Sequence, residues 1–195
     1  RHNELNPVVE QAVRDALETK LPSASLRCAA NLPYSISSPV LIALLESGLP
    51  FRSLTLLVQL EVGQKLCAKP GSEEWGILSI IRAMHADAEI VRKVPRQVFW
   101  PQPKVDSAVV RVTPRTEKTA PQEYAAIKRL IHGLFQYRRK SILQGARHAF
   151  GLSSEQARSW LEACGISPSD HVEKLSMESL RKLALSLPQA ETATT

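Results

Sequence analysis

Residues 26–34 read Leu-Arg-Cys-Ala-Ala-Asn-Leu-Pro-Tyr, and this stretch decides the fold. The largely apolar run from Leu26 to Leu32 predicts a short buried strand. Pro33 ends that strand because proline has no N–H group to donate within a sheet. Ligands of open α/β sheets bind outside the carboxyl ends of the strands. We therefore expect a functional site at residues 31–34.

The chemistry of residues 31–34 suits a base that carries an amino group. Asn31 has a carbonyl oxygen that can accept a hydrogen bond from an amine, and Pro33 leaves neighbouring backbone carbonyl groups available as acceptors. Tyr34 supplies a flat face for stacking. Two acceptors directed at the N6 amine of adenine would orient its lone pair toward a methyl donor, so positioning would carry the rate enhancement. An ordinary strand-to-loop turn is the alternative reading of these four residues.

The chain around this stretch alternates between strand and helix patterns. Asn6-Pro7 and Ser38-Pro39 each combine a capping residue with a proline, which predicts a helix start. The near-continuous apolar run at residues 53–59 is typical of strands buried on both faces, as in parallel sheets covered by helices. The expected helices span about residues 7–20, 39–45, 61–68 and 77–84, and the expected strands span 26–32, 53–59, 88–94 and 105–112. The segment 77–84 also fits a strand, although a helix is favoured.

Beyond residues 113–116 the pattern becomes helical only. The expected helices there span about residues 122–135, 139–150, 154–164 and 176–187. This change of pattern predicts an α/β domain at residues 1–114, followed by a small all-helical domain at residues 115–195.

A second informative segment, residues 94–111, reads Val-Pro-Arg-Gln-Val-Phe-Trp-Pro-Gln-Pro-Lys-Val-Asp-Ser-Ala-Val-Val-Arg. Pro101 and Pro103 are expected to stiffen a loop that projects Phe99. A phenylalanine on a rigid loop can stack on a base, which is worth about 1–3 kcal/mol per base. Taken alone, the segment also fits a β-hairpin with Phe99 and Trp100 in the core.

The two segments together resemble the small-subunit ribosomal RNA adenine N6-dimethyltransferase family. Asn-Leu-Pro-Tyr at residues 31–34 is similar to motif IV of that family. Phe99, followed by a proline-rich turn and Lys-Val-Asp-Ser at residues 104–107, is similar to its hallmark. The resemblance extends over about residues 26–187. Asp106 and Ser107 are expected to tie the loop to its neighbours.

The resemblance implies a fold, an activity and a partner. The fold is α/β: the C-terminal part of a Rossmann-like class I methyltransferase sheet, with a small all-helical C-terminal domain that binds RNA. The activity is N6-dimethylation of two adjacent adenosines near the 3′ end of small-subunit rRNA. S-adenosyl-L-methionine is the cofactor, and a monomer acts in the cytoplasm during ribosome biogenesis.

The resemblance also implies roles for single residues. Asn31 and the backbone carbonyl of Leu32 would hold the target amine, and Pro33 would fix the turn. Tyr34 and Phe99 would sandwich the adenine. Asn31 would also contact the cofactor.

Two departures from the family pattern bear on these expectations. The residue after Tyr34 is Ser35, where the family commonly has Asn. No Gly-x-Gly sequence occurs, so the leading cofactor loop of the family is expected to be absent and the chain to be truncated at its N-terminus. Two rivals therefore stay open: a non-catalytic RNA- or ribosome-binding remnant of the family, and a large-subunit rRNA adenine methyltransferase.

Charge points to a polyanionic partner. The 195 residues include 25 Lys and Arg against 19 Asp and Glu, a formal charge of +6. Residues 124–150 hold six of these cations and no acidic residue, as expected for contacts to RNA phosphates. The candidate RNA-binding residues are Lys104, Arg138, Arg139, Lys140 and Arg147, of which those at 138–140 could alternatively support packing between the domains.

Other classes of protein are disfavoured. The five histidines and three cysteines lack the spacing of metal ligands, so we expect no metal site. No apolar run approaches the roughly 20 residues that a membrane-spanning helix needs, so we expect no membrane partner.

Overall fold

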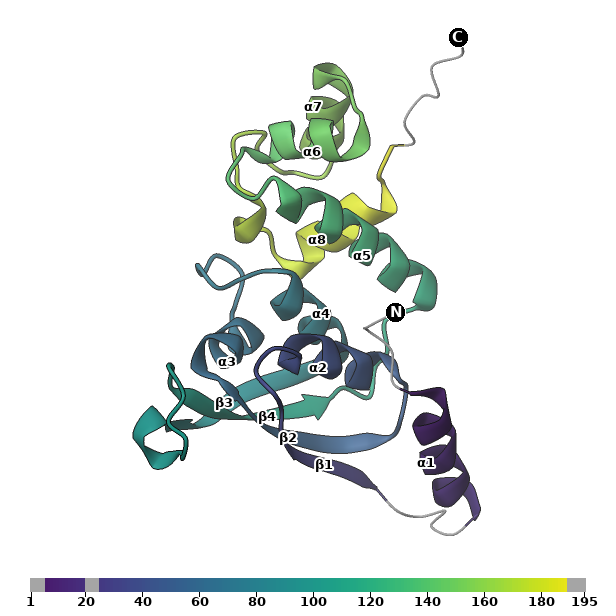
Figure 1. Cartoon of the computed structure of the whole chain (residues 1–195). Helices are drawn as coiled ribbons and strands as arrows, with labels where there is room; N and C mark the ends of the chain where they lie inside the picture. The colour runs from purple at the N-terminus through teal and green to yellow at the C-terminus, as the bar shows by residue number, and fades with distance from the viewer. Residues whose placement is uncertain (1–5, 20–24, 189–195) are drawn as a thin grey trace. The chain divides into compact units, whose positions relative to one another are not determined.

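The computed structural model describes residues 6–19 and 25–188, which form two compact units (Figure 1). One unit comprises residues up to 68 together with 81–118, and the other comprises 69–80 together with residues from 119 onward. The elements of the first unit and of the segment between are α1 (Pro7–Thr19), β1 (Leu26–Asn31), α2 (Ser37–Glu46), β2 (Phe51–Gln59), α3 (Leu60–Cys67), α4 (Ile77–His85), β3 (Ala86–Val94) and β4 (Ser107–Pro114). Four helices follow: α5 (Pro121–Gln136), α6 (Ile142–Phe150), α7 (Ser154–Ala163) and α8 (Met177–Leu185).

The sheet of the first unit has the strand order β1-β2-β4-β3. β1 and β2 run parallel, with Asn31 opposite Leu57, whereas β4 runs antiparallel to both of its neighbours. Ser107, the first residue of β4, lies opposite both Gln59 at the end of β2 and Val94 at the end of β3. The loop between β3 and β4 therefore lies at the sheet edge where β1 and β2 end.

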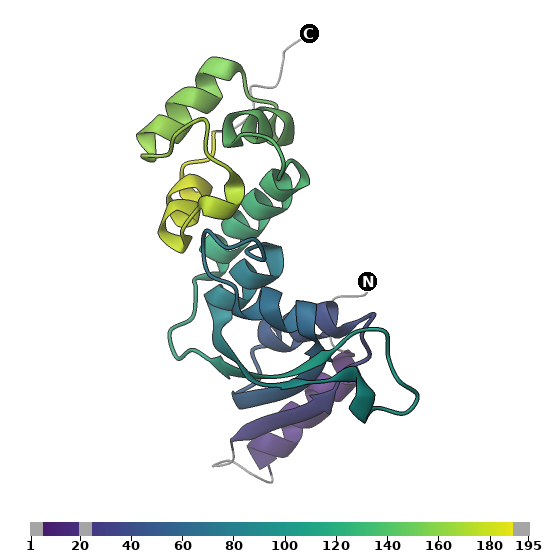
Figure 2. The same cartoon turned by 90° about the vertical axis from the view of Figure 1, so that its left-hand side faces the viewer.

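Helices lie on both sides of this sheet but bury only one face. α2 and α3 lie on that face, whereas α1 lies on the other side and has no buried residue (Figure 2). β2 and β4 supply the centre of the core through alternating residues that are buried: Leu54, Leu56, Val58, Ala108, Val110 and Val112. α3 approaches β4 closely at Gly63, where an added Cβ would lie 3.1 Å from Cβ of Ala108.

A buried arginine holds the end of α3. Arg82 of α4 donates hydrogen bonds to the carbonyl oxygens of Leu66 (2.7 Å) and Ala68 (3.2 Å). Carbonyl groups at a helix C-terminus lack partners within the helix and carry partial negative charge, so a cation is favoured there. Burial lowers the pKa of Arg82 from its ordinary value.

The helical unit is organised around α5, whose inward residues Ile127, Leu130, Ile131 and Leu134 are buried. Serine side chains cap the following helices. Ser153 forms a capping box with Gln156 at the start of α7, and Ser176 accepts a hydrogen bond from the backbone N–H of Ser179 at the start of α8.

The expected strands and helices are all present, with shifted boundaries. α2 begins at Ser37 without a side-chain cap, so the prediction that Ser38 caps it is wrong. The helix expected from residue 139 begins at Ile142, because Ser141 caps it and residues 137–140 form a turn. Asn6 caps α1 as predicted, since its side chain accepts from the backbone N–H of Val8 at 2.9 Å. Lys20, where that helix was expected to end, lies outside the described residues.

Candidate active site

A pocket of about 350 Å³ lies at the sheet edge where β1 ends. Two segments far apart in the sequence line it: the residues that follow β1 and the loop between β3 and β4. The lining residues are Asn31, Leu32, Pro33, Tyr34, Phe99, Trp100, Pro101 and Pro103. The structure thus brings all five of the sequence-predicted catalytic residues into one pocket.

Tyr34 is anchored to the sheet by its hydroxyl group. The Tyr34 and Ser107 hydroxyl oxygens are 2.6 Å apart and hydrogen-bonded, and Ser107 is fully buried. On the backbone side, the carbonyl oxygen of Tyr34 accepts from the hydroxyl group of Ser37 at 3.2 Å. With both ends of the residue held, the ring of Tyr34 has a fixed orientation in the pocket.

Two oxygens at the end of β1 are available to a ligand. Asn31 is exposed, and within the described part of the chain its carboxamide has no hydrogen-bond partner. The same holds for the carbonyl oxygen of Leu32, whose N–H is held by the carbonyl oxygen of Leu57 at 3.2 Å. The neighbouring carbonyl of Pro33 accepts from the N–H of Ile36, so it is already engaged.

The loop that carries Phe99 is closed by Arg96 and Asp106. The Asp106 carboxylate accepts from the backbone N–H of Arg96 at 3.0 Å, and the guanidinium of Arg96 donates to the carbonyl oxygen of Lys104 at 3.0 Å. The carbonyl oxygen of Asp106 also accepts from the N–H of Leu60 at 2.9 Å. Asp106 therefore ties the loop to α3, as Ser107 ties it to Tyr34. The sequence predicted that these two residues tie the loop to its neighbours, without naming the partners.

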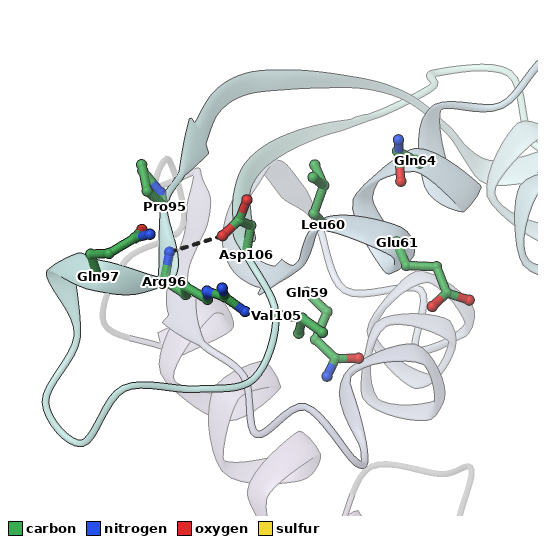
Figure 3. A pocket seen from close by; sticks show the side chains of 9 residues that line it. All are labelled: Gln59, Leu60, Glu61, Gln64, Pro95, Arg96, Gln97, Val105 and Asp106. Carbon is green, nitrogen blue, oxygen red and sulfur yellow. Dashed lines mark hydrogen bonds between the residues drawn. The ribbon is translucent and has the colours of Figure 1, made fainter.

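The same loop forms one wall of a second pocket, of about 640 Å³ (Figure 3). Its lining is mostly polar: Gln59, Leu60, Glu61, Gln64, Pro95, Arg96, Gln97, Val105 and Asp106. A hydrogen bond from Lys65, aided by its positive charge, holds the pKa of Glu61 below its ordinary value. The amide, carboxylate and guanidinium groups of this lining supply both hydrogen-bond donors and acceptors.

Sequence reasoning missed this second pocket. The available signal was a set of three glutamines near strands that end at the same sheet edge: Gln59 is the last residue of β2, Gln64 follows it in α3, and Gln97 follows β3. Reading it required the pairing of β2 with β4, which the sequence pattern does not specify.

Trp100 does not belong to the core, contrary to the alternative prediction of a β-hairpin with Phe99 and Trp100 in the core. Its side chain is 96% exposed, whereas Phe99 is half-buried. The core interpretation of this loop is therefore wrong for Trp100.

The candidate RNA-binding residues differ in their surroundings. Arg138 donates a hydrogen bond to the carbonyl oxygen of Glu73 and lies 3.9 Å from the Glu173 carboxylate, so it is engaged within the helical unit. The others, Lys104, Arg139, Lys140 and Arg147, are exposed, and no ion-pair partner for them occurs among the described residues. These four cations are available to a phosphate backbone.

Two further features concern metals and membranes. Nowhere in residues 6–19 and 25–188 do three or more His, Cys, Asp or Glu side chains gather closely enough to hold a metal ion. Among the helices in those same ranges, none is long and apolar enough to cross a membrane.

Comparison with known proteins adds a family. The family model described as "Ribosomal RNA adenine dimethylase" matches residues 2–189. The chain is 37% identical to ribosomal RNA small subunit methyltransferase A of Ligilactobacillus salivarius, with 80% of this chain and 54% of that protein covered. It is 38% identical to the protein of the same name from Geobacter metallireducens, with 92% and 68% covered. The chain spans 54% to 62% of the length of its first three curated relatives.

Solved structures show the same fold. A dimethyladenosine transferase from Plasmodium falciparum superposes with a TM-score of 0.66 at 23% identity, covering 87% of this chain and 69% of that one. The 23S rRNA methyltransferase ErmE superposes with a TM-score of 0.59 at 21% identity, covering 94% and 80%. The sheet and its helices therefore have a Rossmann-like methyltransferase fold.

Proposed function

Because the chain belongs to the ribosomal RNA adenine dimethylase family, we propose that the protein dimethylates N6 of two adjacent adenosines near the 3′ end of small-subunit rRNA. The observation that carries this proposal is the pocket that unites residues 31–34 with Phe99. The names of its relatives support the small-subunit substrate over a large-subunit one.

The target amine is held by the two available oxygens. The side-chain oxygen of Asn31 and the carbonyl oxygen of Leu32 accept hydrogen bonds from the N6 hydrogens. These bonds draw the nitrogen lone pair out of conjugation with the ring and aim it out of the plane. Because both acceptors are set by the end of β1, no reorganisation is needed when charge develops on the amine.

The adenine ring is held by stacking. Tyr34 and Phe99 line the same pocket and sandwich the flipped base, each stack contributing about 1–3 kcal/mol. That gain offsets the few kcal/mol needed to extrude a base from its neighbours. The bond from Tyr34 to Ser107 keeps the ring in position between successive transfers.

The cofactor of this reaction is S-adenosyl-L-methionine. When bound, it supplies a methyl group on a positively charged sulfur. Asn31 fits a role beside it, because its carboxamide is exposed at the carboxyl end of β1 and carries both a donor and an acceptor. Sharing one residue between amine and cofactor would bring the two reacting groups together.

The division of labour within the chain follows the charges. We assign residues 1–114 to the catalytic domain, apart from the segment 69–80 that belongs to the helical unit, and residues 115–195 to a helical RNA-binding domain. Arg139, Lys140 and Arg147 contact rRNA phosphates there, and Lys104 does so beside the pocket. Arg138 mainly supports packing, given its bond to Glu73. We further propose that the protein acts on this rRNA as a monomer in the cytoplasm.

Tyr34→Ala in the full-length protein tests the proposal. We expect methyl transfer to small-subunit rRNA to fall by at least tenfold, with RNA affinity changed little, because one stack is lost while the phosphate contacts remain. Tyr34→Phe keeps the ring and loses only the bond to Ser107, so it should retain more methyl transfer than Tyr34→Ala. A wild-type protein that binds the RNA but transfers no methyl group would establish the non-catalytic alternative instead.

A further inference from the structure

Trp100 is the one tryptophan of the three that is not buried. Trp75 and Trp160 are 1% and 5% exposed, whereas the side chain of Trp100 is 96% exposed. Tryptophan gains most from burial, so an isolated indole in solvent contributes nothing to folding. Such exposure is explained when the ring serves a partner.

The position of Trp100 links it to the target pocket. It directly follows Phe99, and both residues line the pocket of residues 31–34. Phe99 is half-buried, and Trp100 is almost entirely in solvent. The two rings therefore occupy successive depths, with Trp100 at the mouth.

The surroundings of Trp100 favour a nucleic acid over an apolar protein surface. Residues 89–106 contain four cations against two acidic residues, Glu89 and Asp106, which stand at the two ends of the stretch. These cations are all exposed: Arg92, Lys93, Arg96 and Lys104. A flat aromatic ring amid positive charges is the combination that binds unpaired nucleotides, with stacking for the base and charge for the phosphates.

We propose that Trp100 is a stacking platform for the unpaired base next to the target adenosine in the RNA strand. The inference rests on the proposed function, because it takes the pocket to be the target site. Stacking on this neighbour holds the strand while Tyr34 and Phe99 hold the target. Since every base has a flat face, the platform selects an unpaired flank rather than a particular sequence.

Binding of matched RNA hairpins to the full-length protein tests the platform. One hairpin has two adjacent adenosines in its loop, and in two others the nucleotide on one side of the target is replaced by an abasic residue. We expect Trp100→Ala to weaken binding of the intact hairpin by about 5- to 150-fold. One of the abasic replacements should weaken binding to the wild type by the same factor as Trp100→Ala does. The same replacement should not weaken binding to Trp100→Ala any further.

Three controls separate stacking from a structural effect. Trp100→Phe keeps an aromatic face and should restore most of the affinity. Val98→Ala removes another exposed apolar side chain of the same loop that lines neither pocket, and should bind as the wild type does. The tryptophan emission of the wild type should be quenched by RNA, and that of Trp100→Phe should not.

Several outcomes would overturn the inference. If Trp100→Ala binds the intact hairpin as tightly as the wild type does, the inference is wrong. The proposed function then still stands, provided that the wild type methylates the RNA. Trp75 and Trp160 are buried, so the emission of Trp100 is the difference between the spectra of the wild type and Trp100→Phe; a difference spectrum typical of a buried indole would show that another protein surface covers Trp100. If the wild type neither binds nor methylates RNA, the proposed function itself fails and the inference falls with it.

Discussion

At the residue scale, the hydrogen bond between Tyr34 and Ser107 couples the pocket of residues 31–34 and Phe99 to the first residue of β4. Tyr34 is half-buried and can reach water, whereas the hydroxyl group of Ser107 is fully buried. The two partners are therefore not equivalent. A buried hydroxyl group that loses its partner cannot be rescued by solvent.

This asymmetry gives a prediction for stability. We expect Tyr34→Phe to lower the free energy of unfolding by about 1–2 kcal/mol, because it leaves the Ser107 hydroxyl unsatisfied. Ser107→Ala should cost less, since the tyrosine hydroxyl can turn to water. Urea denaturation of both variants measures the difference, and a larger loss for Ser107→Ala would show that the bond has been misjudged.

The residues of the pocket could be predicted because each group is contiguous in sequence. Residues 31–34 and Phe99 stand within short segments whose types indicate their chemistry. The hydrogen bond of Arg138 could not be predicted in this way, because its acceptor is the carbonyl oxygen of Glu73, 65 residues away in the sequence. The exposure of Trp100 likewise depends on which neighbouring elements reach the loop.

At the scale of the elements, the buried guanidinium of Arg82 holds the end of α3, and its hydrogen bonds all go to backbone carbonyl oxygens. Arg82 donates to the carbonyl oxygens of Leu66, Ala68 and Ala86, so three acceptors depend on one buried guanidinium. α3 follows β2 directly, and Asp106 bonds to its first residue, Leu60. A shift of α3 would therefore displace Asp106 and the loop that carries Phe99.

We predict that Arg82→Met destabilises the protein by about 2–4 kcal/mol, because buried carbonyl groups lose charged donors. Arg82→Lys is the control, since it keeps the charge but offers a single nitrogen, and it should lose less. Thermal unfolding followed by circular dichroism measures both. An unchanged melting temperature for Arg82→Met would contradict this account of α3.

Element types were predictable further than element boundaries. Helix and strand periodicities, with proline and serine at the ends, predicted the type of the expected elements, although the pattern of residues 77–84 fits a strand as well as the helix that it forms. Boundaries failed where two signals competed, as at residues 139–142, where helix-forming residues precede the serine that caps α6. The position of β4 between β2 and β3 could not be predicted, because the sequence pattern does not specify which strands pair.

At the scale of the whole molecule, the formal charge of +6 predicts strong dependence of RNA binding on salt. Each phosphate contact contributes roughly 0.7–0.9 to the slope of log affinity against log salt concentration. Neutralising Arg139, Lys140 and Arg147 together, each to Gln, should reduce the slope by about 2–3 and weaken binding to all RNA sequences alike.

Fluorescence anisotropy with a labelled rRNA hairpin over a range of potassium chloride concentrations measures these slopes. Arg158→Gln is the control, because Arg158 is exposed on α7 of the same unit but already lies 3.7 Å from the Glu162 carboxylate. An unchanged slope for the triple variant would remove the three cations from the RNA interface.

The central claim is that the pocket of residues 31–34 and Phe99 dimethylates adenosine. Its most direct test is mass spectrometry of the nucleosides of small-subunit rRNA after reaction with S-adenosyl-L-methionine and the full-length protein. We expect N6,N6-dimethyladenosine at two adjacent positions with the wild type, and none with Asn31→Ala. Two results would contradict the claim. In one, the folded wild type binds the rRNA but does not methylate it. In the other, Asn31→Ala methylates the rRNA as well as the wild type does.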